Sequence, residues 1–141
     1  MIARHRIVFL SFLLFACQDP VPNDRAANAP DRRAEQRPDQ LWTICQDPNR
    51  GLAAADACAA LIQSGQVTGQ RLVYVHYNRG LALSRRGRTQ AAIADFDTVL
   101  GMDPLFALAF HQRGLAYRQL GQSLRAEQDL QRARQLDARL Q

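Results

Sequence analysis

Three cysteines are the residues of this 141-residue chain best suited to chemistry: Cys17, Cys45 and Cys58. Paired thiols can form a disulfide, take part in redox exchange or contribute to a metal site. A redox role would favour a CxxC motif or a cysteine at a helix N-terminus, and the sequence shows neither. A zinc site would require more ligands, because no histidine lies between residues 5 and 76 and two thiolates do not complete such a site.

Patterns for catalysis are otherwise missing from the sequence. The three histidines are His5, His76 and His111, no glycine-rich phosphate loop occurs, and the acidic residues are scattered. We therefore predict a protein that is not an enzyme and that carries no cofactor and no metal. The formal net charge of +5 comes from arginines interspersed with acidic residues, with no basic run longer than two. This distribution does not favour nucleic acid as a partner.

The start of the chain has the pattern of an export signal. Residues 1–16 contain a positively charged beginning and an apolar run that ends in Leu14-Phe15-Ala16-Cys17. The run is too short for a membrane span, which needs about 20 residues. By resemblance to the lipobox, Cys17 would be lipidated and become the first mature residue. Conventional cleavage beside an incidental cysteine is the alternative. In the lipoproteins that this signal resembles, an Asp after the cysteine holds the protein at the inner membrane, so the resemblance implies an outer-membrane protein, because Gln18 stands there, and one that faces the periplasm.

A linker is expected between this signal and the folded part. Residues 17–38 hold the cysteine to be lipidated, four prolines, many charged residues and few apolar ones. Such a composition cannot bury enough apolar surface to offset the entropy of ordering, so we predict disorder.

From residue 39 onward the pattern is helical. Glycines suited to left-handed C′ positions are each followed by a residue able to cap the next helix: Gly87 by Thr89, and Gly121 by Ser123. Asp103-Pro104 is predicted to be the N-cap and first residue of a further helix. We expect six helices in three hairpins, at about 40–46, 51–64, 70–86, 90–101, 105–119 and 124–138.

These helices contain an internal repeat whose two copies follow one another at a constant offset. Arg79-Gly80-Leu81-Ala82 recurs as Arg113-Gly114-Leu115-Ala116, and the identities continue at Gly87/Gly121, Ala92/Ala126, Asp95/Asp129 and Asp103/Asp137. The pattern resembles the tetratricopeptide repeat, with copies at 73–106 and 107–141. The usual leading tryptophan is replaced by His76 and Phe110. The resemblance implies an all-α fold, a short right-handed α-hairpin solenoid that binds proteins.

Residues 39–72 resemble a degenerate first hairpin. Ala54, Cys58 and Leu61 align with Ala92, Phe96 and Val99. This alignment places Cys45 on the helix that faces Cys58. Since an exported chain meets an oxidising compartment, we predict a disulfide between them. Closing a loop of this size contributes about 3 kcal/mol.

Charged pairs recur with the repeats. Arg79 and Asp95 are separated along the chain by the same interval as Arg113 and Asp129. We expect each pair to bridge the two helices of its repeat, and the alternative is contact with a partner. The last helix is polar, because Glu127, Ala133 and Arg134 replace Ile93, Val99 and Leu100. An array should end at such a face.

A binding groove is implied by the resemblance, since the first helix of each repeat lines the concave face. The candidate groove residues are Tyr74, Tyr77, Asn78, Leu81, Arg85, His111, Gln112, Leu115 and Arg118. Aromatic residues and arginine dominate interface energetics, so a peptide or protein of acidic character fits. We predict a lipid-anchored periplasmic adaptor. The alternative is a permanent structural subunit of an envelope, secretion or pilus assembly.

Overall fold

The computed structural model describes residues 37–140, and its regular elements are helical throughout this range. They are α1 (Pro38–Cys45), the 3-10 turn η1 (Pro48–Arg50), α2 (Leu52–Gln63), α3 (Gly69–Arg85), α4 (Thr89–Met102), α5 (Ala107–Gln119) and α6 (Ser123–Leu136). The prediction of six helices without strands is confirmed for these residues. No helix in this range has both the length and the apolar character to cross a membrane. The predicted signal peptide, Cys17 and residues 17–36 of the predicted linker lie outside the described residues.

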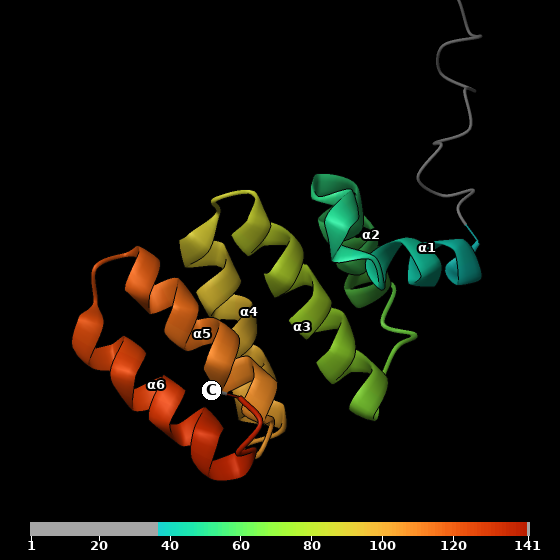
Figure 1. The fold of residues 1–141 in the computed structure, drawn as a ribbon. Helices are drawn as coiled ribbons and strands as arrows, with labels where there is room; N and C mark the ends of the chain where they lie inside the picture. Colours follow the sequence, from blue (N-terminus) through green and yellow to red (C-terminus); the bar gives the residue numbers. More distant parts are fainter. Residues whose placement is uncertain (1–36, 141) are drawn as a thin grey trace, which may run out of the picture. The chain divides into compact units, whose positions relative to one another are not determined.

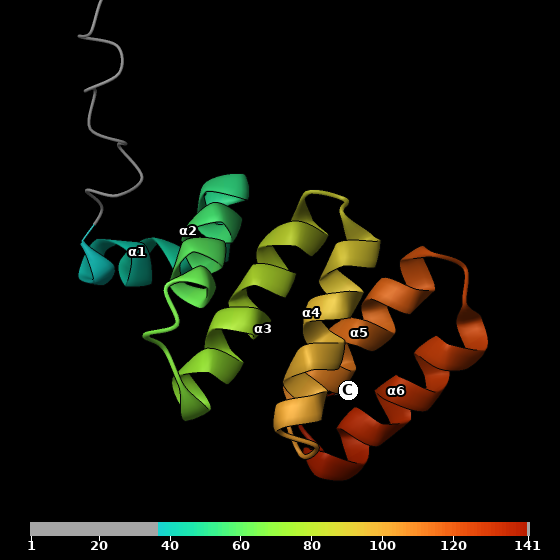
Figure 2. The same cartoon turned by 180° about the vertical axis from the view of Figure 1, so that it is seen from behind.

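The helices pair into three hairpins, α1 with α2, α3 with α4, and α5 with α6, and the last two pairs are antiparallel (Figure 1). Each hairpin packs on the next through α2 against α3 and α4 against α5. Figure 2 shows the same succession from behind. The arrangement follows from the sequence, because short connections between helices force neighbours in the chain to pack side by side.

The core consists of three clusters that join adjacent helices. The first contains the cysteines and crosses from the first hairpin to α3: Leu41, Cys45, Ala57, Cys58, Leu61 and Val75. The second joins α2, α3 and α4, and Phe96 is its largest fully buried side chain. The third joins α3, α4 and α5 around Val99. The predicted correspondence of Ala54, Cys58 and Leu61 with Ala92, Phe96 and Val99 agrees with their burial.

Gly80 and Gly114 allow the two helices of each repeat to approach closely, as the repeat pattern predicts. A Cβ atom at Gly80 would lie 2.7 Å from Cε1 of Phe96. At Gly114 it would lie 3.0 Å from Cγ of Leu130 and 3.1 Å from the carbonyl oxygen of Ala126. These distances are shorter than ordinary packing distances, so larger residues would push the two helices of each hairpin apart.

Several predicted helix ends are wrong. Asp103 does not cap a following helix, because it ends α4, and α5 begins only at Ala107. The Asp103 carboxylate accepts a hydrogen bond from Leu105 N, and its carbonyl accepts one from Phe106 N. These two bonds form a turn in place of a first helical turn.

The predicted caps Thr89 and Ser123 are also wrong. Each is the first residue of its helix, the N-caps are Arg88 and Gln122, and neither makes a side-chain capping bond. The hydroxyl of Thr89 instead donates to Oε1 of Gln119 on the next hairpin. α1 also begins earlier than predicted, because Pro38 is already helical and proline is favoured at a first helical position.

The last helix presents a polar outer face. Glu127 and Arg134 are exposed and form an ion pair of 3.1 Å. The corresponding Ile93 and Leu100 of α4 are buried. Ala133 departs from the predicted outer face, because it is fully buried.

Candidate functional site

The candidate groove residues differ in how far they reach the surface. Tyr74, Arg85 and Arg118 are exposed, whereas the remaining six are partly buried. Leu108, at the position in α5 that corresponds to Tyr74 in α3, is also exposed. The exposed fractions of Tyr74 and Leu108 are 46% and 42%. Each repeat thus presents one large side chain with an apolar surface at the same position.

An aromatic cluster supports this surface from beneath. The ring of Tyr77 lies 5.2 Å from that of Phe106 and 6.1 Å from that of Phe96, measured between centroids. The ring of Tyr74 meets Phe106 edge-on at 5.6 Å. Burial raises the pKa of the Tyr77 hydroxyl, although nearby Arg85 opposes this. Tyr77 is therefore a packing residue between the repeats, and Tyr74 is the member of the cluster most open to a partner.

Arg85 connects the first repeat to the first hairpin. Its Nη1 donates a 2.7 Å hydrogen bond to Oδ1 of Asn49 in η1.

The groove residues of α5 differ in exposure: Arg118 is exposed, whereas His111, Gln112 and Leu115 are partly buried. The structure thus divides the predicted groove into supporting residues and a smaller set that can contact a ligand.

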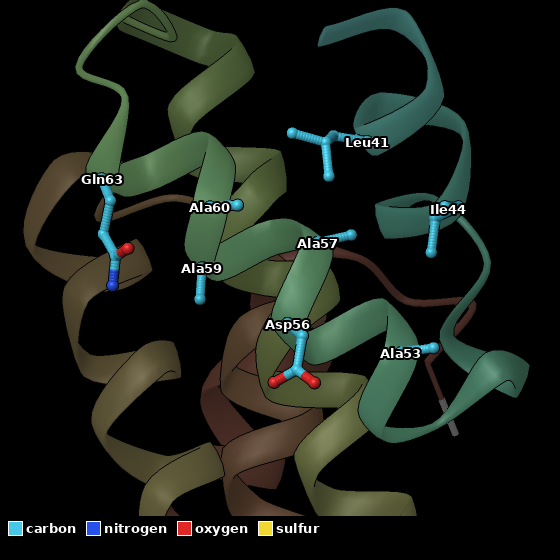
Figure 3. Close-up of a pocket in the computed structure, with 8 residues that line it drawn as sticks. All are labelled: Leu41, Ile44, Ala53, Asp56, Ala57, Ala59, Ala60 and Gln63. Atoms are coloured by element: carbon cyan, nitrogen blue, oxygen red, sulfur yellow. The ribbon is translucent and has the colours of Figure 1, made fainter. Parts of the chain in front are cut away.

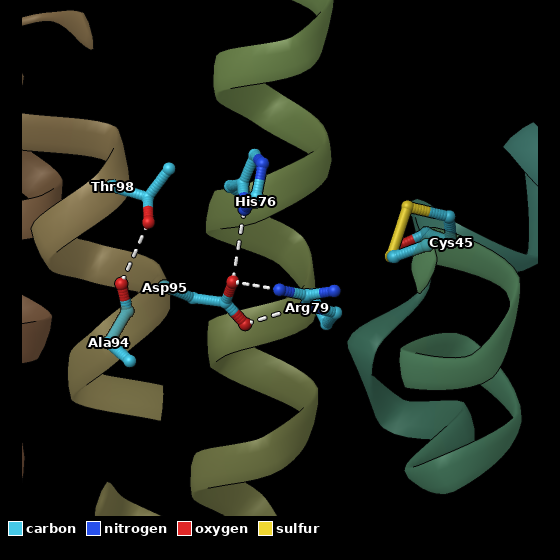
Figure 4. Close-up of polar contacts among 7 residues, drawn as sticks. Cys45, His76, Arg79, Ala94, Asp95 and Thr98 are labelled. Carbon is cyan, nitrogen blue, oxygen red and sulfur yellow. Dashed lines mark hydrogen bonds and ion pairs between the residues drawn. A yellow bond between two sulfur atoms is a disulfide. The ribbon is translucent and has the colours of Figure 1, made fainter. Parts of the chain in front are cut away.

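A buried carboxylate network lies between α3 and α4 (Figure 4). Arg79 donates to Asp95 through Nε at 2.8 Å and Nη2 at 2.6 Å, and His76 donates through Nδ1 at 3.0 Å. Burial acts to raise the pKa of Asp95, but the hydrogen bonds from His76 and Arg79 outweigh it. The pKa of Asp95 is consequently below its ordinary value. The predicted bridge between the helices of the first repeat is confirmed, with His76 as an additional donor.

The second repeat repeats the bridge with a different third member. Arg113 donates to Asp129 through Nε at 2.7 Å and Nη2 at 2.8 Å. Its Nη1 donates to Asp97 of the preceding hairpin at 2.6 Å. The hydrogen bond to Asp129 raises the pKa of Arg113, partly opposed by burial and assisted by Asp97. Arg113 thus links both helices of its own repeat to α4.

Two of these partners were not predicted from the sequence. His76 stands where the repeat usually has tryptophan, and a polar residue at an apolar position was the available signal. Asp97 and Arg113 are separated along the chain by the same interval that joins Arg79 to Asp95. That spacing could have identified Asp97 as a partner of Arg113.

The first hairpin holds the predicted Cys45–Cys58 disulfide, whose Cα atoms are 4.9 Å apart. A cavity of about 430 Å³ lies between α1 and α2 (Figure 3). Figure 3 shows Ala53 and Ala57 facing α1, and Asp56 and Ala59 pointing away from it. The guanidinium of Arg71 in α3 lies 4.5 Å from the ring centre of Trp42 in α1. Among residues 37–140, no three His, Cys, Asp or Glu side chains are grouped as a metal site requires.

Comparison with known proteins finds a matching repeat family and a similar solved structure. The family model for the tetratricopeptide repeat matches residues 73–104 and 107–139. Among solved structures the chain is similar to MamA MSR-1 C2, with 25% sequence identity and a TM-score of 0.61. The similarity covers 80% of this chain and 62% of MamA MSR-1 C2, so this chain spans less than two thirds of the length of MamA MSR-1 C2. No curated protein matches.

Proposed function

The chain is a tetratricopeptide repeat protein over residues 73–139, and on that premise we propose that it is a lipid-anchored adaptor of the bacterial envelope. It faces the periplasm and presents α3 and α5 to a protein or peptide partner of acidic character. A permanent place in an envelope, secretion or pilus assembly is the competing function, and the experiment below separates the two.

The equivalent exposure of Tyr74 and Leu108 is the observation that carries this proposal. In both repeats the same position on the first helix keeps a large side chain in solvent. Phe106 holds the Tyr74 ring from one side, which reduces the freedom that binding would remove. Rigid aromatic side chains of this kind are frequent among the residues that dominate binding energy. Arg118 lies exposed on the same helix as Leu108 and adds positive charge for an acidic partner.

A photocrosslinking experiment tests the surface. A photoreactive phenylalanine derivative replaces Tyr74 or Leu108 in the full chain, expressed in its own host. The control carries the same group at Gln128, an exposed position on α6. A protein captured at Tyr74 and Leu108 but not at Gln128 supports the proposal. Equal capture at all three positions, or capture at Gln128 alone, contradicts it.

Resistance of the non-crosslinked complex to salt separates the adaptor from the subunit. In a parallel purification without crosslinking, an adaptor should release its partner in a mild salt wash, because charged contacts at a partly exposed surface are screened. A partner that stays bound through high salt and co-purifies in fixed ratio would favour a permanent subunit.

Lipidation is proposed at Cys17, on the resemblance of Leu14-Phe15-Ala16-Cys17 to a lipobox. Cells fed labelled palmitate should incorporate the label into the wild-type chain but not into a Cys17→Ala variant. The variant should also leave the membrane fraction. Membrane retention of an unlabelled wild-type chain would contradict this part of the proposal. Outer-membrane location, favoured by Gln18, is tested by fractionation of the two membranes.

A further inference from the structure

A cleft of about 410 Å³ separates α2 from α4 on the side of the molecule formed by the second helices. Both helices pack on α3 but not on each other. Alanines form its walls, and the Arg79–Asp95 ion pair forms part of its floor. The alanines are Ala55, Ala59, Ala91 and Ala94. The volume falls within the roughly 300–1,000 Å³ of typical ligand sites.

The second repeat supplies an internal comparison for this cleft. Arg113 uses Nε and Nη2 for Asp129 of its own repeat and Nη1 for Asp97 on the preceding second helix. Arg79 uses Nε and Nη2 for Asp95 in the same way. Within residues 37–140, however, its Nη1 has no hydrogen-bond partner.

The reason lies in one residue of α2. The alignment that matches Ala54 with Ala92 and Cys58 with Phe96 also matches Ala59 with Asp97. The second repeat receives a carboxylate from the preceding helix, whereas the corresponding residue of α2 is Ala59, which lines the cleft together with Arg79. The exposed fraction of the Arg79 side chain is 27%, against 19% for Arg113. A donor of fixed geometry therefore faces the cleft without an acceptor.

We propose that the cleft binds the carboxylate of a glutamate or aspartate side chain from the partner protein. The carboxylate occupies the place on Arg79 that Asp97 occupies on Arg113, and apolar atoms beside it contact the alanine walls. Arginine favours carboxylates because its planar donors match their oxygens. The inference rests on the proposed function only in assigning the carboxylate to a protein partner.

The other charges that line the cleft are Arg88 and Asp56, and neither is ion-paired among the described residues. Arg88 adds to the attraction for an anion. The negative charge of Asp56 opposes this attraction. Because Asp56 lies one helical turn before Ala59, its carboxylate is the group of this chain that could compete with the partner's carboxylate for Arg79. Neutralising Asp56 should therefore strengthen binding of the carboxylate.

Two blocked tripeptides test the site, acetyl-Leu-Glu-Leu-amide and its neutral counterpart acetyl-Leu-Gln-Leu-amide. The readout is the Nε–H signal of Arg79 in the NMR spectrum of the full chain, with the Nε–H signal of Arg113 as internal reference. The glutamate peptide should shift the Arg79 signal and bind roughly tenfold more tightly than the glutamine peptide, as expected for a charged hydrogen bond. The Arg113 signal should not respond.

Two variants exchange the environments of the arginines. Ala59→Asp supplies the missing internal carboxylate and should abolish the response of Arg79. Asp97→Ala removes the carboxylate from Arg113 and should make that signal respond to the glutamate peptide. Both positions are at the surface or partly so, which favours retention of the fold. Unchanged thermal unfolding of Ala59→Asp, or an increase in its midpoint, confirms that a lost response is not a loss of folding.

Three results would overturn the proposal. The first is equal affinity for the two peptides, and the second is an unchanged Arg79 response in Ala59→Asp. The third is a wild-type chain that binds neither peptide, together with an Arg79 signal that shifts in the Asp56→Asn variant without any peptide. That result would mean that the carboxylate of Asp56 already accepts a hydrogen bond from Arg79. Crosslinking at Tyr74 reports on the proposed function separately, so either idea can fail while the other stands.

Discussion

Replacing Asp95 by asparagine should destabilise the fold far more than the same change at Asp97. Asp95 is almost fully buried and accepts three hydrogen bonds, two from Arg79 and one from His76. Breaking a buried charge pair typically costs about 3–5 kcal/mol. Arg79 still reaches solvent, and asparagine keeps one acceptor, so we expect about 2–3 kcal/mol. For a domain near 100 residues this is a fall in Tm of roughly 10–20 °C.

The control is Asp97→Asn, which removes a half-exposed partner from Arg113 while Asp129 remains in place. Surface pairs of this kind contribute about 0.2–1 kcal/mol. Urea unfolding followed by circular dichroism at pH 7 measures both variants. A loss at Asp95 no larger than that at Asp97 would refute the view that a buried carboxylate contributes more to stability here than a half-exposed one.

The pH dependence of the same variant gives a second check. The pKa of Asp95 is lowered in the folded state, so its contribution is complete above the unfolded value of about 3.9 and declines as pH falls through the folded value. The difference in unfolding free energy between wild type and Asp95→Asn should therefore shrink below about pH 4. A difference that grows on acidification would contradict the assignment.

Other predictions concern the disulfide and the glycines. Reduction of Cys45–Cys58 should lower the unfolding free energy by about 3 kcal/mol in urea titrations with and without reductant, and an unchanged midpoint would show that the bond does not stabilise the hairpin. Non-reducing mass spectrometry of exported protein should show the linked peptides, and free thiols would contradict them. Gly80→Ala should lower Tm, because the added Cβ meets the ring of Phe96 at a cost of about 1–3 kcal/mol that exceeds the helix-propensity gain. Gly101→Ala, at an exposed helical position with open space around it, should raise stability by about 0.5–1 kcal/mol. Equal signs for the two glycine variants would contradict the packing argument.

Much of the fold could be predicted because it depends on the spacing of residues along the chain. The regular recurrence of small residues specifies where two helices touch, and Gly80 and Gly114 lie at such contacts. Helix starts were less predictable, because a residue that can cap has other partners available. Thr89 bonds Gln119 of the next hairpin, and Asp103 forms a turn with Leu105. These competing bonds depend on tertiary neighbours that local sequence rules do not include.

The candidate site was harder to predict for a related reason. Type and spacing correctly paired Arg79 with Asp95 and Arg113 with Asp129, since both partners lie within one repeat. The residues that distinguish the pairs come from outside the repeated pattern. His76 replaces an apolar residue of the family, and Asp97 reaches Arg113 across the boundary between hairpins.

This distinction bears on how a short array acquires specificity. The recurring residues of the two repeats build nearly the same helix pair twice, so they cannot by themselves make one surface different from the other. The differences arise where one repeat meets its neighbour. Ala59 offers no acceptor to Nη1 of Arg79, whereas Asp97 accepts a hydrogen bond from Nη1 of Arg113. Each arginine is already bound by the aspartate of its own repeat. The neighbouring helix can therefore carry a carboxylate or lack one while the ion pair within the hairpin stays intact. With the carboxylate site proposed for the cleft, binding specificity would change through single residues on α2 and α4 while the repeats that fold the chain stay constant.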